Sequence, residues 1–124
     1  MALKIRQTPD MPKKPRPILC LGAGGIVRDA HLPAYKKAGF SLMGIFDIDK
    51  SKASALAKQY GIQNVFSSLQ DAIKAAPEQV IFDVAVPASA IMDILPHLPN
   101  GAAVLIQKPM GSHLQEAKKI RDLC

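Results

Sequence analysis

The stretch that decides the fold is residues 18–27, Ile-Leu-Cys-Leu-Gly-Ala-Gly-Gly-Ile-Val. Its first four residues form an unbroken apolar run, which predicts a short buried strand that ends at Gly22. A helix-like segment follows to about residue 37, and we expect an interruption at Pro33 because proline cannot donate a helical hydrogen bond. A strand, a glycine-rich turn and a helix in this order predict a turn that holds phosphate groups at the helix N-terminus. Gly22 permits the tight bend, and Gly24 lets the backbone approach the phosphates.

An acid follows the second predicted strand. Residues 40–46 are mostly apolar and end at Asp47, where a carboxylate can accept both ribose hydroxyls of an adenosine. We therefore predict a nucleotide site, although a glycine turn without a ligand and an S-adenosylmethionine-dependent methyltransferase remain alternatives. A carboxylate repels the 2′-phosphate of NADP, so Asp47 favours NAD. NADP stays possible because Lys50, Ser51 and Lys52 follow closely and could hold a phosphate.

Strand-like and helix-like segments alternate along the rest of the chain. We predict further strands at residues 65–66, 80–86 and 102–107, with helices near residues 49–60, 68–76, 91–98 and 112–124. Pro96 must distort the helix at residues 91–98. Asp49, Ser68 and Ser112 are predicted helix caps, and Gly39 and Gly61 are predicted helix stops. Five strand–helix repeats predict an α/β fold, a doubly wound parallel sheet with strand order 3-2-1-4-5.

The composition fits a single domain that is preceded in the sequence by a basic segment. The chain has 124 residues, of which 48% are hydrophobic, and a net charge of +6. Residues 1–16 are predicted to be a solvated leader, since they contain three prolines and most of the net charge; their basic residues are Lys4, Arg6, Lys13, Lys14 and Arg16. We expect no nucleic-acid partner, because no basic face with aromatic residues follows. No apolar run is long enough to span a membrane, and two distant cysteines fit a cytoplasmic protein with no metal site.

Four segments together resemble the N-terminal domain of the glucose–fructose oxidoreductase/inositol dehydrogenase/rhizopine-catabolism (Gfo/Idh/MocA) family. They are residues 21–35, Phe46-Asp47, residues 85–87 and Gln107-Lys108-Pro109. The resemblance covers residues 17–124, which it implies are an NAD(P)-binding Rossmann domain. Family members are NAD(P)-dependent oxidoreductases that act mostly on sugars, cyclitols and related metabolites. The family's second α/β domain, which carries most substrate contacts and the Asp and His of the proton relay, is absent from this chain.

The resemblance also implies site residues. The cofactor-binding residues would be Gly22, Gly24, Gly25, Ile26, Asp47, Pro87 and Lys108. Lys108 would also be catalytic, helping to bind substrate and tuning proton transfer. Three departures weigh against full catalytic competence: Gln107 replaces the usual glutamate, Ile91 replaces a frequent histidine, and Val27 replaces a small residue. A branched side chain at residue 27 should loosen helix–strand packing or force a small shift.

The resulting hypothesis is an oxidoreductase that transfers hydride between a nicotinamide cofactor and a hydroxyl-bearing carbon of a sugar, cyclitol or similar small metabolite. We expect the parent protein to be longer, with a homo-oligomer as one possible assembly, and we expect this chain alone to be inactive. The alternative is a nucleotide-sensing module without turnover. Two further residues are noted. His31 could approach the cofactor but is assigned to packing or the surface, and Asp83, inside an apolar strand, must be hydrogen-bonded or partly exposed.

Overall fold

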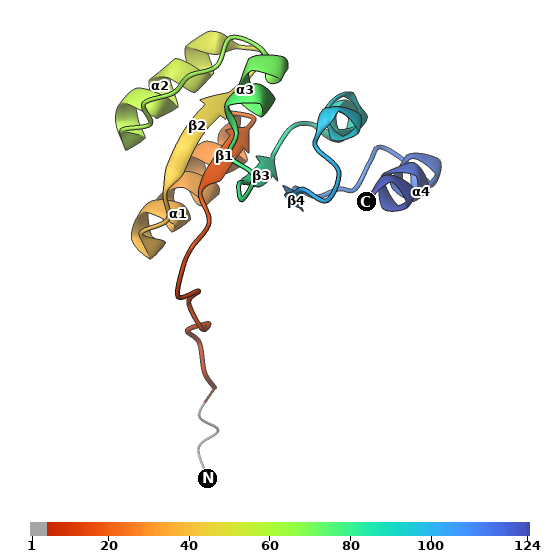
Figure 1. Ribbon diagram of the computed structural model, residues 1–124. Helices are drawn as coiled ribbons and strands as arrows, with labels where there is room; N and C mark the ends of the chain where they lie inside the picture. Colours follow the sequence, from red (N-terminus) through yellow and green to blue (C-terminus); the bar gives the residue numbers. More distant parts are fainter. Residues whose placement is uncertain (1–4) are drawn as a thin grey trace.

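The sheet has four parallel strands in the order β2-β1-β3-β4 (Figure 1). The computed structural model describes residues 5–124. The strands are β1 (Ile18–Leu21), β2 (Leu42–Phe46), β3 (Ile81–Val84) and β4 (Ala103–Ile106). Because all four run in the same direction, their carboxyl ends meet at one edge of the sheet.

The third strand predicted at residues 65–66 is reduced to one parallel bridge, between Ile45 and Val65. The two-residue apolar segment is too short to form a ladder. The Ile45 N–H donates to the carbonyl of Asn64, and the Phe66 N–H donates to the carbonyl of Ile45. The Asn64 side chain donates to the carbonyl of Met43. The predicted count of five strands is therefore wrong. The predicted order is retained, because Val65 lies beside β2 and the remaining strands follow in the expected sequence.

Helices cover both faces of the sheet, as a doubly wound fold requires. Side chains of β1 alternate between the faces: Ile18 and Cys20 join one apolar cluster, while Leu19 and Leu21 join the other. The first cluster includes residues of α1 (Leu32–Ala38) and α2 (Lys50–Tyr60). The second includes residues of α3 (Leu69–Ala75) and α4 (Leu114–Leu123). The buried central strand explains why its sequence is continuously apolar.

Helix ends follow the predicted chemistry with one shift. Asp49 caps α2 by accepting from the backbone N–H groups of Ser51 and Lys52, and Ser68 caps α3. Gly39 and Gly61 end α1 and α2 in the left-handed conformation. The cap of α4 is His113 rather than the predicted Ser112.

The first helix contains a π-helical turn, η1 (Val27–His31), before it continues as α1. The backbone N–H of Leu32 donates to the carbonyl of Val27, five residues back. Pro33 follows at the start of α1 and has no N–H to donate. The hydrogen-bonded turn directly before Pro33 therefore encloses one more residue than an α-helical turn. The predicted interruption near Pro33 takes this form, and the irregularity begins at Val27, where the sequence departs from the family pattern.

The helix predicted at residues 91–98 is broken near Pro96, in line with the distortion expected there, and it does not form as an α-helix. The structure has two 3-10 turns there, η2 (Ala88–Asp93) and η3 (Leu95–His97), and Ile94 lies between them. Pro96 is the physical reason, because a proline in the middle of an α-helix removes a hydrogen bond and clashes with the preceding turn. The apolar residues Ile91, Ile94 and Leu95 are nonetheless buried, as their spacing suggested.

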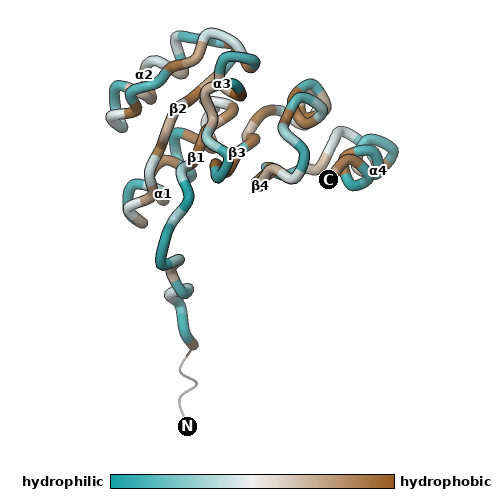
Figure 2. Tube along the Cα trace, viewed as in Figure 1, coloured by the Kyte–Doolittle hydropathy of each residue, from teal (hydrophilic) through white to brown (hydrophobic). Residues whose placement is uncertain are grey.

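Residues 5–17 form no helix or strand and run away from the sheet, and they are mostly hydrophilic (Figure 2). The end of this segment is attached through Arg16, whose guanidinium donates to the carbonyls of Gln79 and Val80. Lys4, one of the basic residues of the predicted leader, lies outside the described residues.

The two cysteines differ in environment, which gives a first testable prediction. Cys20 is buried in β1, and burial, with the charge of Asp83, raises the pKa of its thiol to about 12. Cys124 is exposed. We expect a thiol reagent to modify one cysteine per native chain and both after unfolding in urea. Because the raised pKa favours the neutral thiol in the fold, stability should fall as pH rises from about 9 towards 12. Modification of both thiols in the native chain at equal rates would contradict this assignment.

Candidate functional site

A cavity of about 450 Å³ opens at the carboxyl ends of β1, β2 and β3. It has the size of a small-molecule site and the location at which doubly wound sheets bind ligands. Its lining residues come from three strand ends and from α2, α3 and η2; they are Gly22, Gly24, Phe46, Asp47, Ile48, Asp49, Lys52, Leu69, Ala85, Val86, Pro87, Ala90, Asp93 and Ile94. Four of the predicted site residues, Gly22, Gly24, Asp47 and Pro87, thus share one cavity.

Gly22 forms the bend after β1. Its φ of +121° lies in a region that L side chains rarely adopt. A Cβ atom there would lie 2.3 Å from the carbonyl oxygen of Ala85, so β3 continues so close to the bend that no side chain fits. The Gly22 N–H donates to the carbonyl of Phe46 (2.7 Å), which joins the bend to the end of β2. Glycine at this position is therefore required by the fold itself.

Gly24 is different, because a Cβ atom there would meet no protein atom within 4 Å. The space beside its backbone is open towards the cavity that it lines. Gly25 and Ile26 follow at the start of the helix and do not line the cavity; Ile26 is 42% exposed. The backbone of this turn therefore leaves an open approach to the helix N-terminus, where amide groups attract anions.

The Asp47 carboxylate connects the glycine turn to the end of β2. Its Oδ2 accepts from the backbone N–H of Ala23 (2.7 Å), and its Oδ1 accepts from the N–H of Asp49 (2.8 Å). Each carboxylate oxygen can accept a second hydrogen bond. The side chain is held in place by the backbone and lines the cavity with acceptor capacity to spare.

The basic residues beyond Asp47 do not act as a group. The Lys50 ammonium donates to the hydroxyl of Ser67 (3.3 Å), and the Ser51 hydroxyl donates to Asp49. Only Lys52 lines the cavity. Of the three candidates for a phosphate ligand, the structure leaves Lys52 in position to contact a bound molecule.

Apolar side chains make most of the cavity wall, and sequence reasoning missed them. Phe46, Ile48, Leu69, Ala90 and Ile94 surround the polar groups. The signal available in the sequence was an isoleucine directly after Asp47, and in the structure this Ile48 side chain is 96% exposed. Such walls suit the flat, weakly polar face of a nucleobase.

Lys108 lies apart from the cavity lining. It follows β4, which is the neighbour of β3, and its side chain is exposed. Its backbone N–H donates to the side-chain oxygen of the preceding Gln107 (2.7 Å), and the Lys108–Pro109 peptide bond is cis. The structure thus brings Lys108 to the same edge of the sheet as the glycine turn, without placing it in the cavity.

A buried polar network links β3, the first helix and the end of β4. Asp83 is fully buried in β3; its Oδ2 accepts from the hydroxyl of Tyr35 (2.8 Å) and lies 2.8 Å from Nδ1 of His31. On its other side, Nε2 of His31 lies 3.1 Å from the amide nitrogen of Gln107. Burial and the bond to Asp83 raise the pKa of Tyr35. Asp83 is hydrogen-bonded as predicted, whereas the assignment of His31 to simple packing or the surface missed these partners.

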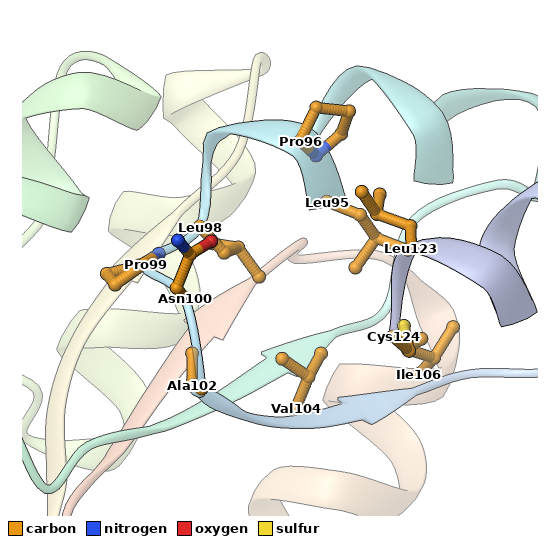
Figure 3. A pocket seen from close by; sticks show the side chains of 11 residues that line it. Leu95, Pro96, Leu98, Pro99, Asn100, Ala102, Val104, Ile106, Leu123 and Cys124 are labelled. Carbon is orange, nitrogen blue, oxygen red and sulfur yellow. The ribbon is translucent and has the colours of Figure 1, made fainter.

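A second cavity, of about 310 Å³, lies between η3, β4 and the end of α4 (Figure 3). Its walls are formed by Leu95, Leu98, Val104, Ile106 and Leu123, with the amide of Asn100 and the thiol of Cys124 at its rim. It contains none of the predicted site residues and no lysine, arginine or acidic side chain. It therefore offers no charged side chain for a phosphate.

Within residues 5–124, no group of histidine, cysteine and acidic residues is arranged to hold a metal ion. Within the same residues, no helix has both the length and the apolar character needed to cross a membrane.

Known proteins match this chain in sequence pattern and in structure. A profile of an oxidoreductase family described by an NAD-binding Rossmann fold, GFO_IDH_MocA, matches residues 17–124. No curated protein matches the sequence. Among solved structures, an oxidoreductase from Thermotoga maritima is 25% identical with a TM-score of 0.76, and the match covers 89% of this chain and 35% of that one.

Two further structures were solved with bound molecules. The WlbA dehydrogenase from Bordetella pertussis, in complex with NADH and UDP-GlcNAcA, has a TM-score of 0.74 and 23% identity over 94% of this chain and 34% of its own. The myo-inositol dehydrogenase from Lactobacillus casei, in complex with NAD(H) and myo-inositol, has a TM-score of 0.73 and 19% identity over 89% and 33%. At this identity the two show the fold alone.

This chain spans about a third of the length of these solved proteins. The profile match covers most of the chain, and the strand order is that of a doubly wound domain. The chain belongs to the GFO_IDH_MocA oxidoreductase family and forms its NAD-binding Rossmann domain.

Proposed function

We propose that this domain binds NAD across the carboxyl edge of its sheet and is the cofactor half of an oxidoreductase acting on a sugar, cyclitol or similar small metabolite. The observation that carries the proposal is the single cavity lined by the glycine turn, Asp47 and Pro87. The cavity combines a glycine turn whose backbone a diphosphate could approach, a carboxylate that could accept hydrogen bonds from ribose hydroxyls, and apolar walls that suit a base.

The residues present fit each part of a dinucleotide. The open space beside Gly24 and the following amides would receive the diphosphate. Asp47 would accept hydrogen bonds from the adenosine ribose, with its orientation already set by the N–H groups of Ala23 and Asp49. Pro87, after β3, would border the path from the diphosphate towards the end of β4.

When bound, the nicotinamide would donate or accept hydride, which is the cofactor's own chemistry. This chain would contribute orientation and charge. Lys108, at the end of β4, would bring an ammonium group to the nicotinamide side, where it could donate a hydrogen bond to a substrate hydroxyl or to the cofactor. Its exposed position leaves its side chain free to reach a bound molecule.

A sensing module without turnover is the second candidate function. The observation that favours it is the position of Lys108 outside the cavity lining, next to an uncharged Gln107. Both candidates require dinucleotide binding; they differ in whether substitution of Lys108 by methionine removes a measurable hydride transfer from the parent protein.

A thermal-shift comparison of NAD, NADP and S-adenosylmethionine tests the proposal on the chain as it is. We expect NAD to raise the melting temperature most, since a ligand that binds only the folded state stabilises it. Stabilisation by S-adenosylmethionine alone would reject the proposal in favour of a methyltransferase. No stabilisation by any of the three at millimolar concentration would reject a nucleotide site.

Substitution of Asp47 by alanine should change cofactor selectivity. In the wild-type chain the carboxylate repels a 2′-phosphate, so NADP should bind at least about tenfold more weakly than NAD. In the variant, the affinity for NAD should fall about tenfold, because its ribose loses the contacts with the carboxylate. The affinity for NADP should change little or rise, because the repulsion is removed and Lys52 lines the cavity. Asp71→Ala, in α3 and outside the cavity lining, is the matched control. Equal losses for both cofactors would show that Asp47 does not select between them.

A further inference from the structure

The polar network around His31 has a fixed direction of hydrogen bonding, which follows from one backbone group. The N–H of Lys108 can only donate, so the side-chain atom of Gln107 that it meets at 2.7 Å must be the oxygen. The amide nitrogen of Gln107 therefore faces His31, at 3.1 Å from Nε2. The side chain of Gln107 cannot be turned round without bringing its NH2 group against the Lys108 N–H.

The amide NH2 group can also only donate, so Nε2 of His31 must be an acceptor without a proton. The ring hydrogen is then on Nδ1, where it meets a good acceptor, Oδ2 of Asp83 at 2.8 Å. Tyr35 donates to the same oxygen, and every member of the network points its donors towards the buried carboxylate. The groups that face the imidazole are thus Asp83 from β3, Tyr35 from α1 and Gln107, which directly follows β4.

We propose that Gln107 fixes His31 as the neutral Nδ1–H tautomer, and that the resulting chain from Asp83 through His31 and Gln107 positions the backbone of Lys108 relative to the glycine turn. His31 belongs to the π-helical turn that directly follows the glycine turn, and Gln107 precedes Lys108. Three hydrogen bonds therefore connect the fully buried Asp83 to Lys108. The positioning role rests on the function proposed above for Lys108, whereas the tautomer does not.

The identity of residue 107 decides the state of the imidazole. A glutamate at position 107 would still accept from the Lys108 N–H through one oxygen. Its second oxygen would face Nε2 of His31, and a hydrogen bond between them would require a proton on Nε2. The ring would then take up a proton from solvent and become an imidazolium between two carboxylates, those of Asp83 and residue 107. An amide at this position excludes that state, because imidazolium Nε2–H and amide NH2 are both donors.

Two-bond ¹H–¹⁵N correlation spectra of the ¹⁵N-labelled chain test this directly, because they distinguish both neutral tautomers and the imidazolium. At pH 7 we expect His31 in the wild-type chain to show the neutral Nδ1–H pattern, and in Gln107→Glu to show the imidazolium pattern. Gln107→Ala should leave the ring hydrogen on Nδ1, where Oδ2 of Asp83 still accepts it, and should give an upfield shift of the Lys108 amide proton, which loses its acceptor. Gln63→Glu, which adds the same charge at an exposed loop residue, should leave the wild-type pattern unchanged.

The neutral Nε2–H form or an imidazolium in the wild-type chain would overturn the proposal, as would a neutral ring in Gln107→Glu. Titrating NADH into the same wild-type sample separates this inference from the proposed function. Absence of binding with the Nδ1–H pattern intact would reject the NAD site and leave the tautomer assignment standing. Binding of NADH to a chain with the other tautomer would reject the network and leave the site.

Discussion

Replacement of Gly22 by alanine should destabilise the fold by about 3 kcal/mol or more. The backbone there has φ of +121°, and the added Cβ would lie 2.3 Å from the carbonyl oxygen of Ala85. Because the obstructing atom belongs to the backbone, relief requires β3 to move away from β1 at the centre of the sheet. Urea denaturation followed by circular dichroism measures the loss as a lower transition midpoint.

Gly61→Ala is the matched control. Gly61 also has a positive φ, of +68°, but a Cβ atom there would meet no atom within 4 Å. We expect a cost of about 1 kcal/mol from the left-handed backbone alone. The difference between the two variants isolates the steric contact with Ala85. Equal losses would show that the contact with β3 contributes nothing.

Replacement of Gly24 by alanine should abolish measurable dinucleotide binding without unfolding the domain. No protein atom lies within 4 Å of the added Cβ, so the fold can accept it. The same methyl group would occupy the open approach to the helix N-terminus, where a diphosphate would have to lie against the backbone. We expect NADH affinity to fall at least about thirtyfold, which corresponds to about 2 kcal/mol.

Gly61→Ala serves again as the control for binding, because it weakens the fold outside the cavity and should still bind NADH. A Gly24→Ala chain that melts far below the wild type would attribute the loss to folding instead. A well-folded variant with unchanged NADH affinity would contradict the placement of the diphosphate at this turn.

The sequence predicted the parts of the fold that local chemistry determines. The apolar runs before Gly22 and Asp47 are strands, and the caps at Asp49 and Ser68 form as expected, because each depends on a few adjacent residues. Residues 65–66 and 88–97 were predicted less well. The extent of a short edge strand depends on tertiary neighbours. Pro96 indicated a distorted helix at residues 91–98, but residue spacing does not determine that the segment divides into two 3-10 turns.

The site shows the same division. Gly22, Gly24 and Asp47 were identified because a phosphate-binding turn and a ribose-binding acid need those residue types in that order. The apolar wall at Leu69 and Ile94 comes from segments far apart in sequence, and no spacing rule connects them. The partners of His31 were likewise missed, since Asp83 and Gln107 lie 52 and 76 residues away along the chain.

Amide ¹H–¹⁵N spectra recorded during a titration with NAD test the central claim most directly, because they locate the bound molecule. We predict that the largest shifts fall on the glycine turn and on the residues after β2, at Ala23, Gly24, Gly25, Ile48 and Asp49, with saturation at one equivalent. Shifts concentrated instead at Asn100, Gly101 and Leu123, around the second cavity, would contradict the account, as would spectra that do not change.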